Sequence, residues 1–123
     1  MLKEIEIQGR IRLEASQRGW RLWRNNLGAG ELKNGNFLRW GLANDSIATN
    51  RAMKSGDLIG IRPVLITQEM VGGVIGQFVS MEVKRPGWRF NPNDSHEKAQ
   101  QRWIDLVRAL GGYAIFTTNE EEL

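Results

Sequence analysis

The sequence contains no cysteine and only one histidine among its 123 residues. The absence of cysteine excludes disulfides and thiolate chemistry, and His96 alone cannot build a zinc site from several histidines. A metal ion bound by this chain must therefore be held mainly by oxygen ligands, which favours Mg²⁺ or Mn²⁺. The lack of cysteine also fits a reducing compartment, so we expect a cytoplasmic protein.

Long apolar runs are absent as well. No stretch approaches the roughly 18 apolar residues of a membrane-spanning helix. The first residues, Met-Leu-Lys-Glu-Ile-Glu, lack the apolar core of a signal peptide, so we expect no membrane partner. The length fits one domain over residues 1–123. The net charge of +3 permits a polyanionic partner without requiring one.

Hydrophobic spacing and turn residues predict an α/β chain. Helical spacing of Leu2, Ile5 and Ile11 indicates a first helix over residues 2–16, although Gly9 lies inside it. The pair Asn34-Gly35 predicts a hairpin turn. We expect strands over 20–24, 37–42, 57–67 and 113–117, a turn-rich stretch over 25–36, and an irregular segment with a short helix over 44–55.

The clearest strand covers residues 77–84. Its period of two places Phe78, Ser80, Glu82 and Lys84 on one face and the intervening residues on the other. After a loop, Asp94 is a good N-cap for a helix, with Glu97 three residues on as in a capping box. This helix carries an apolar stripe and ends at a pair of glycines, Gly111 and Gly112.

The triplet Glu82-Val83-Lys84 carries the chemistry. Its two charged side chains share a face, about 7 Å apart along the strand. The glutamate can hold a divalent cation, with the Val83 carbonyl as a further ligand. The lysine can position an attacking water or stabilise charge on a phosphate. A bare triplet of this kind is also common as a solvated ion pair on an exposed strand.

Asp57 lies 25 residues before Glu82, at the head of the preceding predicted strand. If the two strands pair as an antiparallel hairpin around residues 70–76, the start of the first lies beside the end of the second. Asp57 would then reach Glu82 and Lys84. Two carboxylates around one hard cation suit magnesium-assisted phosphate chemistry.

In these residues the chain resembles the VRR-NUC domain, a branch of the PD-(D/E)XK nucleases found in phage and repair proteins. The resemblance covers nearly the whole length. Many family members place a glycine three residues before the aspartate, where this chain has Lys54, and here the glycine is Gly56. The motifs that carry the resemblance are residues 4–8, 23–29, 55–60, 81–84 and 99–103, and the step at 111–112.

The resemblance implies a restriction-endonuclease-like core, with a small mixed β-sheet flanked by helices. It implies that Asp57, Glu82 and the Val83 carbonyl bind the metal ion and that Lys84 is the catalytic lysine. It further implies that Glu4 completes the acidic site and that Gln100 faces it from a helix. Glu14 is an alternative for the role of Glu4, which could equally form an exposed polar pair with Gln8. Gln100 could instead be a boundary residue of its helix.

The implied reaction is hydrolysis of DNA, and stand-alone members of the family act as homodimers on four-way junctions. Basic and amide side chains are candidates for phosphate contacts, whose binding should weaken with salt. Two further hypotheses stay open: a non-catalytic nucleic-acid-binding module, and a phage assembly protein whose tryptophans form an oligomer interface. The candidate DNA contacts are Arg24, Asn25, Asn26, Lys33, Arg39, Lys54, Arg85 and Arg89, of which residues 24–26 could instead stabilise a turn.

Overall fold

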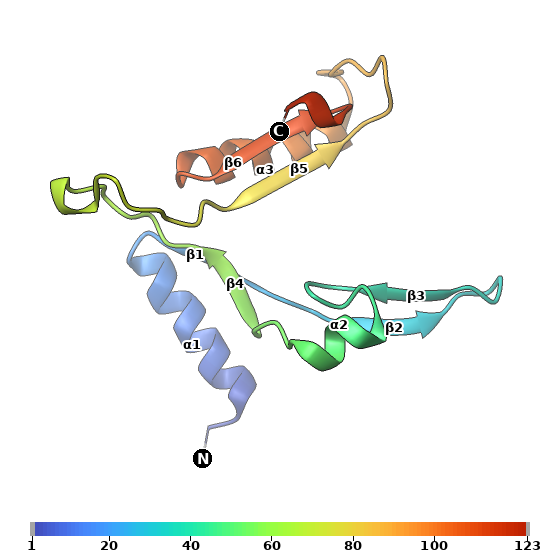
Figure 1. Cartoon of the computed structure of the whole chain (residues 1–123), viewed down its shortest axis with the longest axis horizontal. Helices are drawn as coiled ribbons and strands as arrows, with labels where there is room; N and C mark the ends of the chain where they lie inside the picture. The colour runs from blue at the N-terminus through green and yellow to red at the C-terminus, as the bar shows by residue number, and fades with distance from the viewer. Residues whose placement is uncertain (1, 123) are drawn as a thin grey trace. The chain divides into compact units, whose positions relative to one another are not determined.

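The structure is a computed structural model that describes residues 2–122. The chain divides into two compact units, Met1–Gly60 and Ile61–Leu123. The described residues form a small mixed α/β protein with three α-helices and three two-stranded sheets (Figure 1). We expected one mixed sheet, and the strands instead pair two by two. A single domain over 1–123 stays a prediction, and residues 1 and 123 lie outside the described residues.

The first unit begins with α1 (Glu4–Gln17), which confirms the predicted N-terminal helix. The Lys3 backbone N–H donates to the Glu6 carboxylate at 2.8 Å and so satisfies an otherwise free N-terminal donor. Gly19, with φ of 86°, ends the helix in a left-handed conformation. The helix then packs against strand β1 (Arg21–Arg24), the predicted strand after it.

Strand β1 pairs with β4 (Leu58–Ile61), and Gly60 makes this pairing possible. A Cβ built on Gly60 would lie 1.8 Å from the backbone oxygen of Arg21. Only a residue without a side chain can let the two backbones approach so closely. The short helix that we expected before β4 is present as α2 (Ile47–Ala52), and the Ser46 hydroxyl caps it by accepting from the Thr49 N–H.

A β-hairpin follows β1. Strands β2 (Gly28–Glu31) and β3 (Phe37–Trp40) pair antiparallel around the predicted Asn34-Gly35 turn, which confirms that turn. We expected residues 25–36 to be turn-rich throughout, and β2 is the part that we missed. Its glycines have little intrinsic preference for strands, so the pairing with β3 determines its conformation.

Asn44 joins the ends of this hairpin. The residue is 3% exposed, and its Nδ2 donates to the backbone oxygens of Gly28 and Trp40, both at 2.8 Å. Its Oδ1 accepts from the Arg39 guanidinium, also at 2.8 Å. All the polar atoms of this buried amide therefore have partners, as burial requires.

The second unit contains a strand–helix–strand motif. Strands β5 (Val79–Val83) and β6 (Tyr113–Thr117) pair in parallel, and α3 (Ser95–Ala109) forms the crossover between them. All three elements were predicted within two residues at their ends. The core lies between α3 and one face of the strands, where Ile104, Val107 and Ala114 are at most 2% exposed.

The predicted pairing of residues 57–67 with 77–84 is wrong in the described part of the chain. Strand β4 pairs with β1, and β5 pairs with β6. The first segment also leaves the strand conformation after Ile61, two residues before Pro63. Residues 62–78 contain the 3₁₀ helix η1 (Gln68–Met70) and a turn at Val71 and Gly72, where the Gly73 N–H donates to the Met70 oxygen at 3.0 Å, but this turn does not bring β4 and β5 together as a hairpin. Proline cannot donate to a strand ladder, which explains the early end of β4.

We predict that Asn44→Ala lowers the free energy of unfolding by about 1–3 kcal/mol, because it leaves the oxygens of Gly28 and Trp40 without their buried donor. Chemical denaturation followed by circular dichroism measures this change. The matched control is Asn36→Ala, which alters an exposed asparagine of the same hairpin. Equal midpoints for the two variants would contradict the role of Asn44.

Candidate active site

Strand β5 presents two different faces. Ser80, Glu82 and Lys84 lie half-buried on the face that α3 covers, as the alternation predicted. Val79 and Val83, on the other face, are 52% and 71% exposed. The Ser80 hydroxyl accepts a hydrogen bond from the Trp103 indole at 2.8 Å, which fixes α3 over the strand. The charged residues of the Glu-x-Lys triplet therefore lie under a helix rather than on an open strand.

The helix brings Gln100 to the lysine. The Lys84 ammonium donates to the Gln100 Oε1 at 2.8 Å and lies 3.9 Å from the nearer Glu82 oxygen. The Lys84 side chain is 17% exposed and that of Glu82 is 41% exposed. The Lys84 ammonium is thus bound by a residue of α3 at a largely buried position, while the Glu82 carboxylate remains accessible to solvent. Of the residues predicted for the site, Glu82, Lys84 and Gln100 are brought together.

Two aromatic rings complete the surroundings of Lys84. Its ammonium nitrogen lies 5.6 Å from the centre of the Trp88 ring and 5.8 Å from that of Phe116. Neither ring was expected at the site from the sequence. Trp88 is only four residues after Lys84, but Phe116 becomes a neighbour only because β6 pairs in parallel with β5, in register with Glu82.

Asp94 lies at the start of α3 and caps it. Its carboxylate accepts from the backbone N–H groups of His96 at 2.9 Å and Glu97 at 3.1 Å, which confirms the predicted N-cap. The hydrogen bond from Glu97 is the main cause that holds the pKa of Asp94 below its ordinary value of 3.8, and the charge of Lys84 contributes in the same direction.

Asp57 belongs to the first unit, directly before β4. It is exposed, and its backbone oxygen accepts from the Asn25 N–H at 2.9 Å. The Asn25 amide also donates to the Ser55 hydroxyl at 2.8 Å and to the Gly56 oxygen at 2.9 Å. Asn25, which we considered for DNA contact or for turn stabilisation, therefore holds the segment that carries Asp57.

The predicted metal ligands are divided between the two units. Glu4, exposed in the first turn of α1, lies in the same unit as Asp57, while Glu82 and Val83 lie in the other. In neither unit do the described residues place three or more acidic or histidine side chains around one point. The donor set itself fits a hard cation, since it consists of carboxylate and carbonyl oxygens. The joint ligation by all four residues stays a prediction.

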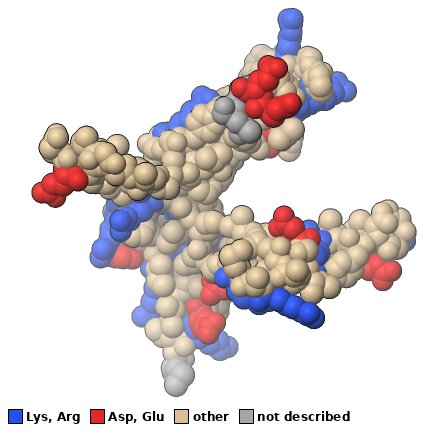
Figure 2. Space-filling model, viewed as in Figure 1, with Lys and Arg blue, Asp and Glu red and all other residues tan. Residues whose placement is uncertain are grey.

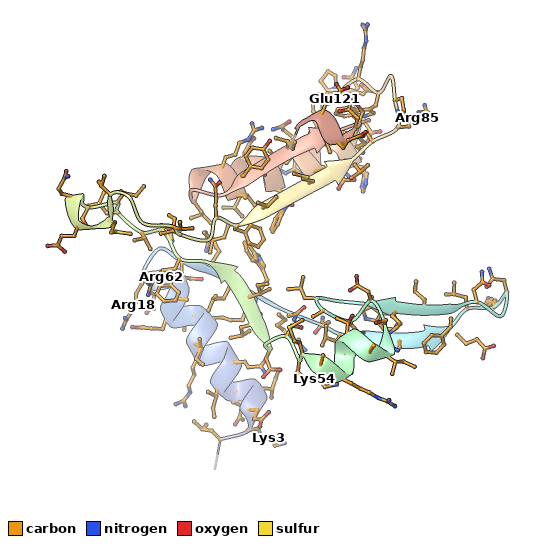
Figure 3. All side chains as sticks on the ribbon, in the orientation of Figure 1. Lys3, Arg18, Lys54, Arg62, Arg85 and Glu121 are labelled. Carbon is orange, nitrogen blue, oxygen red and sulfur yellow. The ribbon has the colours of Figure 1, made fainter. Side chains whose placement is uncertain are left out.

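The candidate DNA contacts fall into two groups. Arg39 is half-buried, donates to the Asn44 backbone and side chain, and has a clear structural role. Lys54, labelled in Figure 3 between α2 and β4, donates to the Asn50 side chain. The remaining candidates have exposed side chains that are accessible to a phosphate, and they are Arg24, Asn26, Lys33, Arg85 and Arg89.

The charged side chains are spread over both units. Figure 2 shows lysine and arginine on each of them, with acidic residues interspersed. Arg85 projects from the loop that follows β5, next to Lys84 in sequence (Figure 3). Among the described residues no helix has the length and apolar character needed to cross a bilayer.

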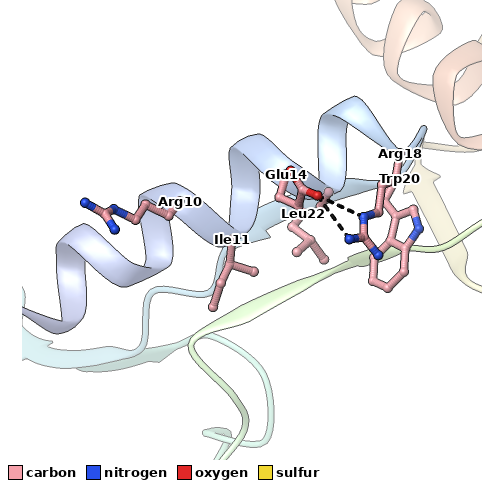
Figure 4. Close-up of a pocket in the computed structure, with 7 residues that line it drawn as sticks. Arg10, Ile11, Glu14, Arg18, Trp20 and Leu22 are labelled. Atoms are coloured by element: carbon pink, nitrogen blue, oxygen red, sulfur yellow. Dashed lines mark hydrogen bonds and ion pairs between the residues drawn. The ribbon is translucent and has the colours of Figure 1, made fainter.

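Two hollows on the surface lie away from Asp57, Glu82 and Lys84. One, between α1 and β1, has a volume of about 380 Å³ and is lined by Trp20, Leu22 and neighbouring residues of α1 (Figure 4). Within it Arg18 is paired with Glu14 at 3.0 Å. The other lies in the second unit between residues 61–78 and the end of α3. Neither hollow is lined by Asp57, Glu82 or Lys84, so shape alone does not identify the site.

We predict that Gly60→Ala destabilises the first unit by about 1–3 kcal/mol or more, because the new methyl group overlaps the Arg21 backbone, which cannot rotate away. Urea denaturation monitored by circular dichroism provides the measurement. Gly56→Ala is the control in the same segment, since its Cβ would meet its nearest neighbour at an ordinary 3.7 Å. The close β1–β4 approach is disproved if both variants unfold at the same urea concentration.

A second prediction concerns pH. The pKa of Asp94 is lowered on folding, so its carboxylate stabilises the fold above pH 3.8, and this contribution is lost as pH falls through the lower folded value. Asp94→Asn keeps a capping oxygen but cannot titrate. The stability difference between wild type and this variant should therefore shrink between about pH 5 and pH 2. Thermal unfolding across this range measures it, and a constant difference would contradict the assignment.

Comparison of the chain with models of known protein families, with curated proteins and with solved structures found no match. The description of the site therefore rests on the residues of this chain and the distances between them.

Proposed function

We propose that this protein is a metal-dependent DNA endonuclease with a restriction-endonuclease-like core. The observation that carries the proposal is the contact of 2.8 Å between Lys84 and Gln100, beside Glu82. A nuclease of the kind that the sequence resembles would need this strand lysine, strand glutamate and helix glutamine to lie together. A solvated ion pair on an exposed strand would need neither the helix nor the burial of the lysine.

The three side chains suit phosphodiester hydrolysis. Lys84 carries a fixed positive charge at a partly buried position, where its interaction with an anionic phosphate is stronger than in water. Gln100 accepts from the ammonium and limits its orientation, leaving the other two N–H groups for a phosphate oxygen or an attacking water. Glu82, the more exposed partner, is able to bind a cation or accept a proton from water.

The resemblance, and no contact in the structure, supplies the proposed metal ligands, which are Glu82, the Val83 carbonyl, Asp57 and Glu4. Bound Mg²⁺ or Mn²⁺ would polarise the scissile phosphate and lower the pKa of a water molecule. Asp57 suits this role because it directly precedes β4 and its backbone is anchored by Asn25, while its side chain stays exposed. The exposed Arg85 and Arg89 follow β5 on the adjacent loop and would contact the DNA backbone.

We further propose branched DNA, in particular four-way junctions, as the substrate of a homodimer. This part of the proposal comes from the resemblance. Two copies of the site related by a twofold axis would cut two strands in a paired manner, which resolves a junction symmetrically. The exposed cations on both units are compatible with a partner that has a phosphate backbone, and their contribution to binding should weaken as salt is raised.

The test is cleavage of labelled four-way, flap and linear duplex DNA in the presence of Mg²⁺. We expect the wild type to cut junctions fastest, and we expect Lys84→Ala and Glu82→Gln each to lower the rate by about 10²-fold or more. Lys98→Ala and Glu69→Gln are matched controls, because they alter exposed residues outside the site and should cut like the wild type.

Each alternative outcome has a distinct meaning. Equal cutting of all three substrates would remove the junction specificity and leave the nuclease. DNA binding without cleavage by the wild type would favour a non-catalytic binding module. Full activity of Lys84→Ala would remove the mechanism.

A further inference from the structure

Three aromatic side chains gather where β5 ends. Trp88, on the loop after β5, and Phe116, on β6, have ring centres 4.6 Å apart. Phe90 completes the cluster, with its ring centre 6.5 Å from that of Trp88 and 6.0 Å from that of Phe116. The Lys84 ammonium lies within 6 Å of the centres of the Trp88 and Phe116 rings. At this distance an aromatic face attracts a cation.

The Lys84 side chain needs contacts with neighbouring groups if its ammonium is to occupy one position. Its four-carbon stem has many rotamers, and immobilising it costs considerable entropy. The hydrogen bond to Gln100 fixes one N–H group, and the ion pair with the more exposed Glu82 is long at 3.9 Å. The two rings lie within 6 Å of the ammonium nitrogen, and the side chain is only 17% exposed.

Trp88 is itself held in place by the helix. Its indole N–H donates to the Glu97 carboxylate at 3.0 Å, and the same oxygen accepts from the Asn91 backbone at 3.1 Å. Glu97 is half-buried in the first turn of α3, the turn that Asp94 caps. The loop and the helix start are thus joined through one carboxylate, which orients the indole beside Lys84.

We infer that Trp88 and Phe116 are positioning residues for Lys84 and that Glu97 maintains the orientation of Trp88. The rings keep the ammonium group between Gln100 and Glu82, so that it is in place before a substrate binds. The effect on cleavage rests on the proposed nuclease function, whereas the placement of Lys84 is a property of the fold and can be measured separately.

The competing explanation is that the aromatic cluster only fills space. A substitution of Phe90 distinguishes this explanation from a role in positioning Lys84. Phe90 belongs to the same cluster and is 39% exposed, but its contacts are with the other two rings. If the cluster only fills space, Phe90→Leu and Trp88→Leu should have similar effects on Lys84. If the rings position the ammonium group, only Trp88→Leu should affect it.

The first experiment measures the ε-methylene resonances of Lys84 by NMR on protein with ¹³C-labelled lysine, assigned by their loss in Lys84→Arg. In the wild type we expect these protons to be shifted upfield by the ring currents of Trp88 and Phe116. Trp88→Leu should move them toward the values of an exposed lysine, and Phe90→Leu should leave them in place. Unshifted wild-type resonances, or equal responses to both variants, would overturn the inference.

The second experiment compares cleavage of junction DNA by the same variants. We expect Trp88→Leu to lower kcat by about 10- to 100-fold with KM changed less than about twofold, because a misplaced catalytic group impairs the chemical step rather than binding. Trp88→Phe retains a ring near the ammonium group but loses the indole N–H that binds Glu97, so it should recover only part of the loss. Phe90→Leu should match the wild type. Wild-type kcat for Trp88→Leu would overturn the inference.

Glu97 offers a second route if Trp88→Leu does not fold, as judged by its thermal unfolding. Glu97→Ala removes the acceptor of the indole N–H, while Glu97→Gln keeps an oxygen there. We expect the alanine variant alone to shift the Lys84 resonances and lower kcat. Equal behaviour of the two variants would remove Glu97 from the proposal. Absence of cleavage by the wild type would refute the nuclease, while the NMR comparison would still decide whether the rings hold Lys84.

Discussion

The hydrogen bond between Lys84 and Gln100 is the interaction on which the candidate site depends. It joins the end of β5 to the middle of α3 and places a cationic group under the helix instead of in open solvent. Burial of a charge is unfavourable without a partner, so the amide oxygen, the nearby carboxylate and the two rings together make the position tolerable. The same contacts leave the carboxylate of the more exposed Glu82 accessible to solutes. The Lys84 ammonium is thus fixed in position, while the neighbouring carboxylate can bind a ligand.

The second unit could largely be predicted from the sequence because its signals are local. The alternation in residues 77–84 specifies which side chains of β5 share a face, and Asp94 marks the start of α3 through its own hydrogen bonds. The end of the helix follows from Gly111, whose φ is 95°. These features depend on residues a few positions apart, which is why periodicity and capping rules find them.

Features that depend on residues far apart in the sequence could not be predicted by these local rules. Strand β2 contains Gly28 and Gly30, which no propensity would assign to a strand, and the Trp40 ring lies over Gly28 where a side chain would collide with it. The partner of β4 is β1, chosen by the close backbone approach at Gly60. The aromatic neighbours of Lys84 come partly from β6, so only the parallel register brings Phe116 to the site.

The two kinds of sheet also imply an order of folding. The hairpin of β2 and β3 joins Glu31 to Phe37, a closure over a few residues, and structures of this kind form in about 1–10 μs. The parallel pair joins Val79 to Tyr113, with a loop and a helix between them. Closing this longer segment costs conformational entropy before the strand contacts form, so we expect the pair to form more slowly than the hairpin. Lys84, Gln100 and the rings therefore come together only after this longer segment has closed.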